Sequence, residues 1–369
     1  MAEVVIHWND FVSWSGTTTI APLIKEKYKA GIIGLGFIGG GDQVSGDAVG
    51  QKVVDLDGTH FSAYANHPRI DLVAGSSRDP GRRERFVARS GARTYADWRT
   101  LLDKEDLDIV SVATYAPQHV QITIACAEKG VRVVYCEKPI ATTIADAKAM
   151  VTACAKAGSL LVINHQRRFN ASHRRLRQLI FDGGLGELTS VSTQWPAGRL
   201  GNVGSHMLDA LQMLTCRKVE AVTARLDLAG KPDCRGPDFS DPGGWGMIRF
   251  KGGLVGLVDA PDYGFVEAGI SVVGTEANAR ITGDGVTVRY RNGDEDHWPY
   301  DESGRSSMDR AADEIVTWLD GETPFPYDAT DTVLTLEVII AFHASHYHNS
   351  EWIEIPLSGA DRELVVNSG

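Results

Sequence analysis

The stretch Lys29-Ala30-Gly31-Ile32-Ile33-Gly34-Leu35-Gly36-Phe37-Ile38-Gly39 joins a short apolar run to three glycines in the spacing G-x-G-x-x-G. The apolar run predicts a buried strand. In dinucleotide-binding folds the first glycine permits the tight turn out of the strand, the second lets the backbone approach a pyrophosphate, and the third lets the next segment pack on the sheet. Backbone N–H groups at the start of a following helix attract phosphate. The stretch therefore predicts a cofactor site at Gly34, Gly36, Phe37, Ile38 and Gly39.

Strand and helix patterns alternate behind this stretch. Strands are expected at 70–75, 107–113, 131–135 and 159–163, with helices at 81–90, 97–103, 118–129 and 144–157. Such alternation predicts an α/β fold with a doubly wound parallel sheet, which binds ligands at the carboxyl ends of its strands. The residues expected there, and assigned to the cofactor, are Ser77, Arg78, Thr114, Tyr115, Pro117, Glu137 and Lys138.

The pattern changes after residue 164. Alternating stretches at 188–194, 219–226, 245–250, 254–259, 269–273, 279–282 and 286–289 are separated by Gly and Asp turns. They predict a large, mostly antiparallel open sheet with one helix-covered face, and helices are expected at 172–181, 307–319 and 329–346. The expected organisation is an arm at 1–28, a dinucleotide-binding domain at 29–164, and a substrate-binding and oligomerisation α/β domain at 165–369.

Composition excludes several classes of function. The chain has 369 residues with 43% hydrophobic and 23% charged residues, typical of a soluble globular protein of two domains. A net charge of −11 argues against a nucleic-acid partner, and no apolar run approaches the ~18 residues of a membrane span. Five cysteines without C-x-x-C spacing favour reduced thiols in the cytoplasm. His343, His346 and His348 lack a partner at ligand spacing, so no metal site is expected.

An ordered set of motifs resembles the Gfo/Idh/MocA oxidoreductase family. The set consists of Gly34-Leu35-Gly36-Phe37-Ile38-Gly39, Thr114…Pro117, Glu137-Lys138-Pro139, Arg168-Phe169 and Gly204-Ser205-His206-Met207-Leu208-Asp209. The resemblance runs from residue 29 onward and leaves out the arm and an insertion at 40–58. It implies a Rossmann domain, a nicotinamide cofactor, a cyclic polyol or sugar substrate, and a homo-dimer or homo-tetramer assembled through the C-terminal sheet.

The resemblance also assigns chemistry to three residues. Oxidation of a carbinol releases a hydroxyl proton, which a positioned Lys or His can accept. The family pattern gives Lys138 contact with the reacting hydroxyl. Asn202 and His206 are four residues apart and share one helix face. The family commonly has Asp where this chain has Asn202, and an amide cannot accept a proton. His206 or Lys138 is therefore expected to carry out the proton transfer, with Asn202 positioning a hydroxyl.

Arginines near the predicted strand ends indicate an anionic substrate. A guanidinium suits bidentate binding of carboxylate, sulfonate or phosphate, and Arg167 or Arg199 is expected to hold such a group. The alternative is that these arginines pair with surface carboxylates or contact the cofactor. The predicted substrate-binding residues are Tyr115, Gln166, Arg167, Arg168, Arg199, Asn202 and His206.

Two activities fit this pattern. The first is a net dehydrogenase or reductase that transfers hydride at a ring carbinol, C3 of a pyranose. The second is a redox-neutral NAD-dependent glycosidase of the sulfoquinovosidase type, which oxidises C3 transiently, eliminates the aglycone, adds water and reduces the ring again. Ser77-Arg78 lacks the acidic residue of NAD sites and favours NADP, whereas the glycosidase resemblance favours NAD. NAD is the expected cofactor, with NADP left open.

Overall fold

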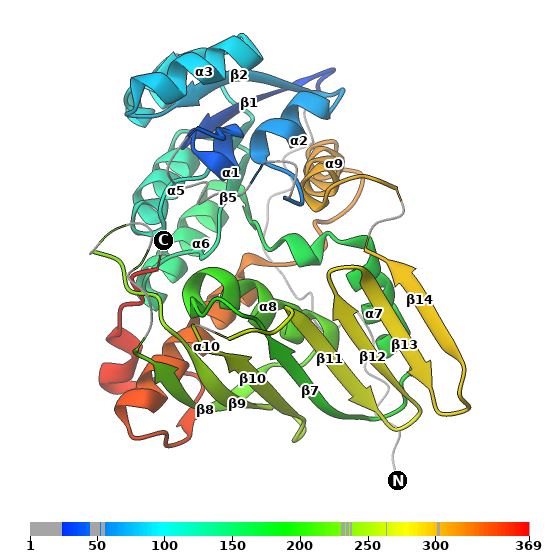
Figure 1. The fold of residues 1–369 in the computed structure, drawn as a ribbon. Coiled ribbons are helices and arrows are strands. Elements are labelled where there is room, and N and C mark those ends of the chain that lie inside the picture. Colours follow the sequence, from blue (N-terminus) through cyan, green and yellow to red (C-terminus); the bar gives the residue numbers. More distant parts are fainter. Residues whose placement is uncertain are drawn as a thin grey trace.

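The computed structural model describes residues 24–44, 52, 56–229, 233, 236, 238–262, 264–300 and 303–368. The chain builds a six-stranded sheet and a nine-stranded sheet, which lie one above the other in the view of Figure 1. The expected arm at 1–28 and the insertion at 40–58 fall largely outside the described residues.

The first sheet is the doubly wound parallel sheet that the sequence predicts. Its strands run in the order β3-β2-β1-β4-β5-β6, and every neighbouring pair is parallel. They are β1 Tyr28–Ile33, β2 Ile70–Ser76, β3 Arg93–Tyr95, β4 Ile109–Val112, β5 Val133–Cys136 and β6 Leu160–Ile163. The helices between them are α3 Pro80–Ser90, α4 Trp98–Lys104, α5 His119–Glu128 and α6 Ile144–Ala157. Both faces are covered, so β4 and β5 are buried along their whole length.

The glycine turn leaves no room for side chains. Gly34 has a φ of 101°, and a Cβ there would lie 2.3 Å from the Ala113 carbonyl oxygen. A Cβ on Gly39 would lie 2.0 Å from the Gly34 carbonyl oxygen. The helix that follows, α1 Phe37–Gly40, has only four residues, and helical structure resumes in α2 His60–Asn66 after the insertion. The insertion thus divides the helical segment behind the turn into two short pieces.

The second sheet is mostly antiparallel, as predicted, with the order β14-β13-β12-β11-β7-β10-β9-β8-β15 and one parallel pair, β7 with β10. Its strands are β7 Leu188–Gln194, β8 Val219–Asp227, β9 Gly243–Phe250, β10 Val255–Ala260, β11 Gly269–Gly274, β12 Ala277–Thr282, β13 Gly285–Tyr290, β14 Glu295–Pro299 and β15 Ile353–Glu354. Strand β14 was not predicted, because the charges at Glu295 and Asp296 conceal the alternation of a largely exposed edge strand.

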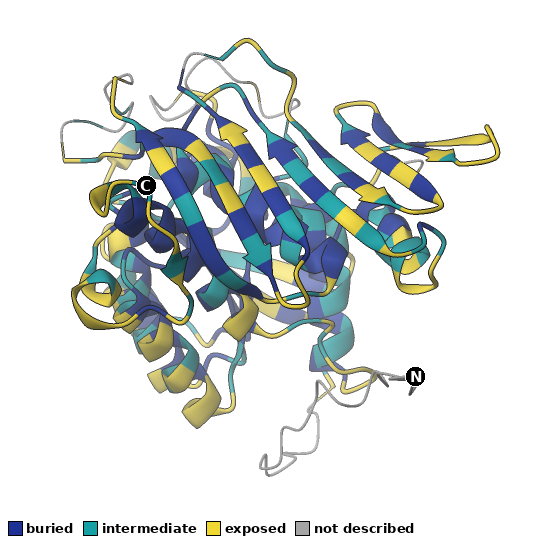
Figure 2. Ribbon diagram, turned by 90° about the horizontal axis from the view of Figure 1, so that it is seen from below, coloured by how far each residue is buried: buried dark blue, intermediate teal, exposed yellow. Residues whose placement is uncertain are grey.

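Helices cover one face of this sheet and leave the other open. They are α7 Ala171–Phe181, α8 Ser205–Thr215 and α10 Ala329–Tyr347, which packs on β8 and against α6. Figure 2 shows the opposite face, where exposed and buried residues alternate along the strands. This is the one-sided burial expected of an open antiparallel sheet.

Helix α9, Ser307–Leu319, returns from the second half of the chain to the first sheet. It packs against α2, and Met308, Ala311 and Ile315 join one buried cluster with Tyr28 and Ile32 of β1. The Tyr28 hydroxyl donates a hydrogen bond to Asp320, directly after α9. A boundary at residue 164 therefore separates the two sheets but not their hydrophobic cores.

Three further sequence expectations concern features of the described residues. None of their helices has the length and apolar character needed to cross a membrane. Their cysteines, Cys126, Cys136, Cys154 and Cys216, are free thiols, and the first three are buried. No group of metal-ligating side chains occurs in this part of the chain. His343 instead lies buried in α10, and His348 pairs with Asp361.

Candidate active site

Lys138 lies where the two halves of the chain meet. It follows β5 of the first sheet, and its peptide bond to Pro139 is cis. Its half-buried ammonium group donates to the side-chain oxygen of Asn202, 2.9 Å away, and lies 3.4 Å from the Asn202 backbone oxygen. Two of the three predicted catalytic residues are therefore in direct contact.

A carboxylate fixes the turn that carries Asn202. Residues Leu200–Gly204 form a π-helical turn ahead of α8, and Arg199 precedes it with a φ of 62°. The backbone N–H groups of Gly201 and Asn202 donate to the two carboxylate oxygens of Asp241, at 2.6 and 2.9 Å. This buried carboxylate, which the sequence did not single out, orients Asn202 toward Lys138.

His206 lies one turn further along, at the start of α8, beside a second histidine. Burial and the positive charges of Lys138 and Arg167 hold the pKa of His206 well below its ordinary value, so the ring is neutral near pH 7. The ring of His165, which follows β6, stands perpendicular to it with 6.0 Å between centroids. Burial lowers the pKa of His165 to about 4. His165 is not among the predicted site residues, although its place after a strand of the parallel sheet is a usable signal.

Arg168 belongs to a buried ion pair. Its guanidinium donates to both carboxylate oxygens of Asp209, at 2.8 to 3.1 Å, and to Asp331 at 3.2 Å. Burial raises the pKa of Asp209, but Arg168 outweighs that effect and holds the pKa below its usual range. With its donors directed at carboxylates, Arg168 is not available to a substrate in this arrangement. The sequence predicted that Arg168 contacts the substrate, whereas its ion pair with Asp209 gives it a role in holding the local structure.

A chain of buried hydrogen bonds supports Glu137, the residue before Lys138. Its Oε1 accepts from Asn164 at 2.6 Å and lies 3.0 Å from His60 Nε2, whose other ring nitrogen lies 2.7 Å from Ser111 Oγ. Burial raises the pKa of Glu137, but His60 and Lys138 outweigh it and hold the pKa below its ordinary value. The Glu137 carboxylate therefore carries its charge next to Lys138.

The predicted cofactor residues line the carboxyl edge of the first sheet. Gly34 and Gly39 close the turn after β1, while Ser77 and Arg78 follow β2, with Arg78 exposed. Asp79 is the first acid beyond this point, and its carboxylate caps α3 by accepting from the Arg82 N–H at 2.9 Å.

The turn after β4 completes this edge. Thr114 has a buried hydroxyl oxygen with no hydrogen-bond partner among the described residues, and Tyr115 is 39% exposed. A glycine cradle that a Cβ would fill, together with an unpaired hydroxyl, suits a dinucleotide. Glu137 and Pro117 lie on the same edge, Glu137 buried in its own network.

Arg167 and Arg199 differ from Arg168. Arg167 lines an open cavity of about 460 Å³ together with Asp57, Met207 and Tyr300, and no ion pair or hydrogen bond to a described residue holds its guanidinium. The Nε atom of Arg199 is buried and also lacks a hydrogen-bond partner in the described chain. Gln166 is engaged with the insertion, because its amide donates to the Asp57 carbonyl oxygen at 3.2 Å. Of the three predicted arginines, Arg167 is the one whose side chain lines this cavity.

Comparison with known proteins finds a family match for the first part of the chain. Residues 28–165 match the family model GFO_IDH_MocA, described as an oxidoreductase family with an NAD-binding Rossmann fold. D-apiose dehydrogenase of Paraburkholderia graminis is 31% identical over 176 residues, which are 47% of this chain and 40% of that protein. The chain spans only 34% to 40% of the length of the first three curated relatives that it matches.

Solved structures extend the likeness to most of the chain. An inositol dehydrogenase homologue from Azotobacter vinelandii, complexed with NADH and myo-inositol, has a TM-score of 0.74 at 18% identity, covering 90% of this chain and 98% of that one. The WlbA dehydrogenase from Bordetella pertussis, in complex with NADH and UDP-GlcNAcA, has a TM-score of 0.71 at 22% identity, covering 91% and 100%. At these identities the likeness shows the fold. Residues 28–165 thus match an oxidoreductase family with an NAD-binding Rossmann fold, and the solved structures share the fold of most of the chain.

Proposed function

We propose that the protein is an NAD-dependent sugar oxidoreductase that acts at a ring carbinol, C3 of a pyranose. The observation that carries the proposal is the 2.9 Å hydrogen bond between Lys138 and Asn202, which joins the cofactor edge of the first sheet to the start of α8. D-apiose dehydrogenase and related sugar dehydrogenases among the relatives support the substrate class. The bound nicotinamide supplies the hydride acceptor.

The protein residues handle the hydroxyl proton. Lys138 is placed to contact the reacting hydroxyl, because its ammonium group already donates to the amide oxygen that a hydroxyl can displace or share. His206 is neutral near pH 7, since its pKa lies well below the ordinary value, so a ring nitrogen can accept a hydrogen bond from the hydroxyl, although the lowered pKa makes it a weak base. Asn202 orients the hydroxyl and cannot itself take the proton.

We assign an anionic substituent of the substrate to Arg167. Its guanidinium lines the 460 Å³ cavity and makes no hydrogen bond or ion pair with a described residue, whereas Arg168 is committed to Asp209. Arg167 also lies close enough to His206 to lower the pKa of that histidine. An anion bound at Arg167 would lie in a cavity that is also lined by Met207, the neighbour of His206, which suits a sugar acid or sulfonated sugar.

The cavity lined by Arg167 is compatible with a second candidate reaction. Its volume of about 460 Å³ lies in the range of about 300–1,000 Å³ that is typical of small-molecule sites in general. An aglycone could occupy it in a redox-neutral glycosidase, in which oxidation at C3 acidifies the neighbouring C–H, the aglycone leaves, and the same hydride returns after water is added. Atoms and electrons then balance without an external oxidant.

One experiment separates the two reactions. The purified protein is incubated with NAD and a panel of free sugars and nitrophenyl glycosides, including a glucuronide and a sulfoquinovoside, while nitrophenol and NADH are followed together. Stoichiometric NADH from free sugars supports the dehydrogenase. Aglycone release without net NADH supports the glycosidase. Absence of both, with NADH binding intact, would refute a sugar substrate.

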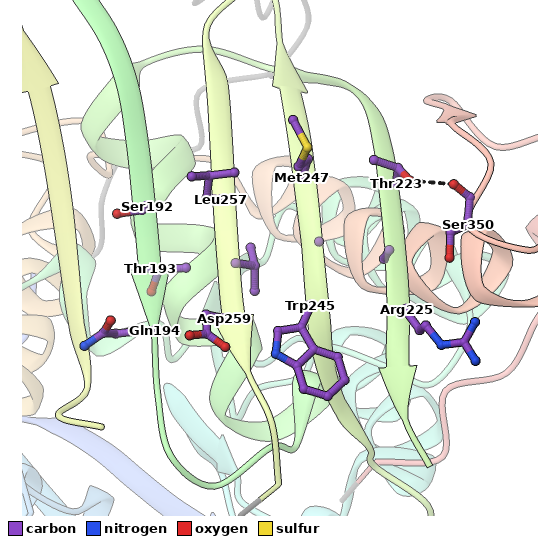
Figure 3. A pocket seen from close by; sticks show the side chains of 13 residues that line it. Ser192, Thr193, Gln194, Thr223, Arg225, Trp245, Met247, Leu257, Asp259 and Ser350 are labelled. Carbon is purple, nitrogen blue, oxygen red and sulfur yellow. Dashed lines mark hydrogen bonds between the residues drawn. The ribbon is translucent and has the colours of Figure 1, made fainter. Parts of the chain in front are cut away.

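We also propose that the open face of the second sheet joins two or four copies of the chain. Figure 3 shows the centre of this face, where Trp245, Met247 and Leu257 project from β9 and β10 beside Arg225 and Asp259. The three apolar side chains are 40% to 47% exposed, and they line a shallow hollow of about 510 Å³. Trp245→Glu should convert an oligomer to monomers in light scattering.

We propose a cytoplasmic location as well, because the free thiols of the described chain suit a reducing compartment.

A further inference from the structure

A buried histidine connects the two loops that frame the proposed reaction centre. His119, the first residue of α5, is fully buried. Its Nε2 lies 2.9 Å from the carbonyl oxygen of Thr114, in the loop after β4. Its Nδ1 lies 3.0 Å from the carbonyl oxygen of Pro139, in the loop after β5, and 3.3 Å from that of Ile140. The ring therefore spans the gap between neighbouring loops of the parallel sheet.

Each of these loops carries predicted site residues. Thr114 begins the turn that exposes Tyr115, while Pro139 directly follows Lys138. The pairing of β4 with β5 ends at Val112 and Cys136, before the two loops begin, so sheet hydrogen bonds do not join the loops. Beyond that point only the Glu137 N–H continues the pairing, by donating to Val112. The histidine thus provides a tie where the strands have already ended.

We propose that His119 is a positioning residue, which holds the Thr114–Pro117 turn and the Lys138–Pro139 loop at a fixed separation and thereby sets where the Lys138 ammonium group stands. It contacts no reacting atom and acts through Lys138, so the inference rests in part on the proposed function. A shift of about 1 Å in a positioned group can reduce turnover about 100-fold, which makes such a tie consequential.

The chemistry of the ring explains why histidine suits this position. Carbonyl oxygens only accept, and a neutral imidazole carries one N–H, so it donates to one loop while the other nitrogen faces the second carbonyl. Burial lowers the pKa of His119, and the carbonyl oxygens together with the Glu137 charge act in the opposite direction. In either tautomer the ring donates a hydrogen bond to one loop and packs against the other, so a side chain without N–H groups removes that one hydrogen bond between α5 and a loop.

The test compares His119→Phe with His119→Gln. Phenylalanine keeps a flat ring and removes both nitrogens, whereas glutamine restores an N–H donor. His343→Phe is the matched control, because His343 is also buried but lies in α10, away from these loops. Measurements are the crystal structure, the dissociation constant of NADH by fluorescence, kcat and KM. We expect the 2.9 Å contact between Lys138 and Asn202 to lengthen in His119→Phe, with kcat about 100-fold lower and KM within about threefold.

Three outcomes decide the matter. Partial recovery of kcat and of the Lys138–Asn202 contact in His119→Gln, with His343→Phe near wild type, supports the tie. An unchanged contact and unchanged kcat in His119→Phe would overturn it, as would equal losses in the phenylalanine and glutamine variants. Failure of the proposed function would appear separately, as full turnover in Lys138→Ala. The crystallographic distance tests the tie even then.

Discussion

Lys138 has two polar environments that differ in one respect. On the side of the first sheet, hydrogen bonds run without a break from Tyr64 through Ser111, His60, Glu137 and Asn164 to Tyr135. On the side of the second sheet, three groups are buried without a hydrogen-bond partner among the described residues. They are both ring nitrogens of His165, Nδ1 of His206 and Nε of Arg199.

The difference separates support from recognition. A buried polar group without a partner costs about 1–3 kcal/mol, so a folded chain rarely leaves several together unless a ligand or water completes them. The completed network beneath Glu137 holds the loop that carries Lys138. The incomplete groups include the predicted substrate residues His206 and Arg199. We therefore propose that substrate recognition takes place on the side with these unmet hydrogen bonds.

The largest effect should follow from Lys138→Ala, at the border between the two environments. Loss of the group proposed to contact the reacting hydroxyl should lower kcat about 100- to 10,000-fold, while NADH binding stays within a few-fold of wild type. Stopped-flow turnover and fluorescence titration provide the two numbers. Retained turnover with weakened NADH binding would assign Lys138 to the cofactor instead.

Arg168→Ala should damage the fold more than any contact with substrate. Removing one partner of a buried ion pair leaves Asp209 charged without compensation, which costs about 3–5 kcal/mol of unfolding free energy. Arg289→Ala is the matched control, because Arg289 and its partner Glu295 are both exposed, and its loss should cost less than about 1 kcal/mol. Urea denaturation gives both values, and equal losses would contradict the structural role of Arg168.

Arg167→Ala should leave stability nearly unchanged and weaken anionic sugars. A hydrogen-bonded charge contributes about 1.5–3 kcal/mol, which corresponds to roughly a 10- to 150-fold rise in KM for a sugar acid, with neutral sugars little affected. Arg199→Ala, measured in parallel, asks whether the other unpaired guanidinium takes the anion. Equal losses for acidic and neutral sugars in both variants would remove the anion-binding role.

Acid should destabilise the protein through its buried histidines. Burial lowers the pKa of His165 to about 4, that of His173 to about 3 and that of His343 to about 4. Because the unfolded chain binds these protons near pH 6.5, their stabilisation is complete above about pH 6.5 and declines as the pH falls. Each should cost roughly 2 kcal/mol at pH 5.

Urea denaturation at pH 7.5 and pH 5 measures this loss. His343→Phe should lose about 2 kcal/mol less than wild type between the two pH values. His297→Ala, at an exposed position, should lose as much as wild type. An equal loss in all three proteins would show that His343 does not titrate as a buried group.

The first sheet was predictable because its signals are local. Apolar runs, glycines and helix caps such as Asp79 and Thr143 lie next to the elements they define. The family motifs predicted Lys138 and Asn202 as site residues, but not the hydrogen bond between them. Asp241 and His119 could not be assigned, because their partners are backbone groups brought together only by folding. Likewise, nothing local distinguishes Arg168 from Arg167, although one is buried in an ion pair and the other faces a cavity. The domain boundary at 164 and the individual site roles stay predictions.

The return of α9 to the first sheet has a consequence for synthesis in the cell. The cluster around Tyr28 contains Met308, Ala311 and Ile315, so the first sheet cannot complete its core when β6 leaves the ribosome. At about 5–20 residues per second, the missing helix arrives roughly 7–30 s later. During that interval the surface reserved for α9 is apolar and uncovered on the nascent chain. A chaperone that binds apolar surfaces could bind the nascent chain during this interval. A chain truncated before Ser307 would keep this surface exposed permanently.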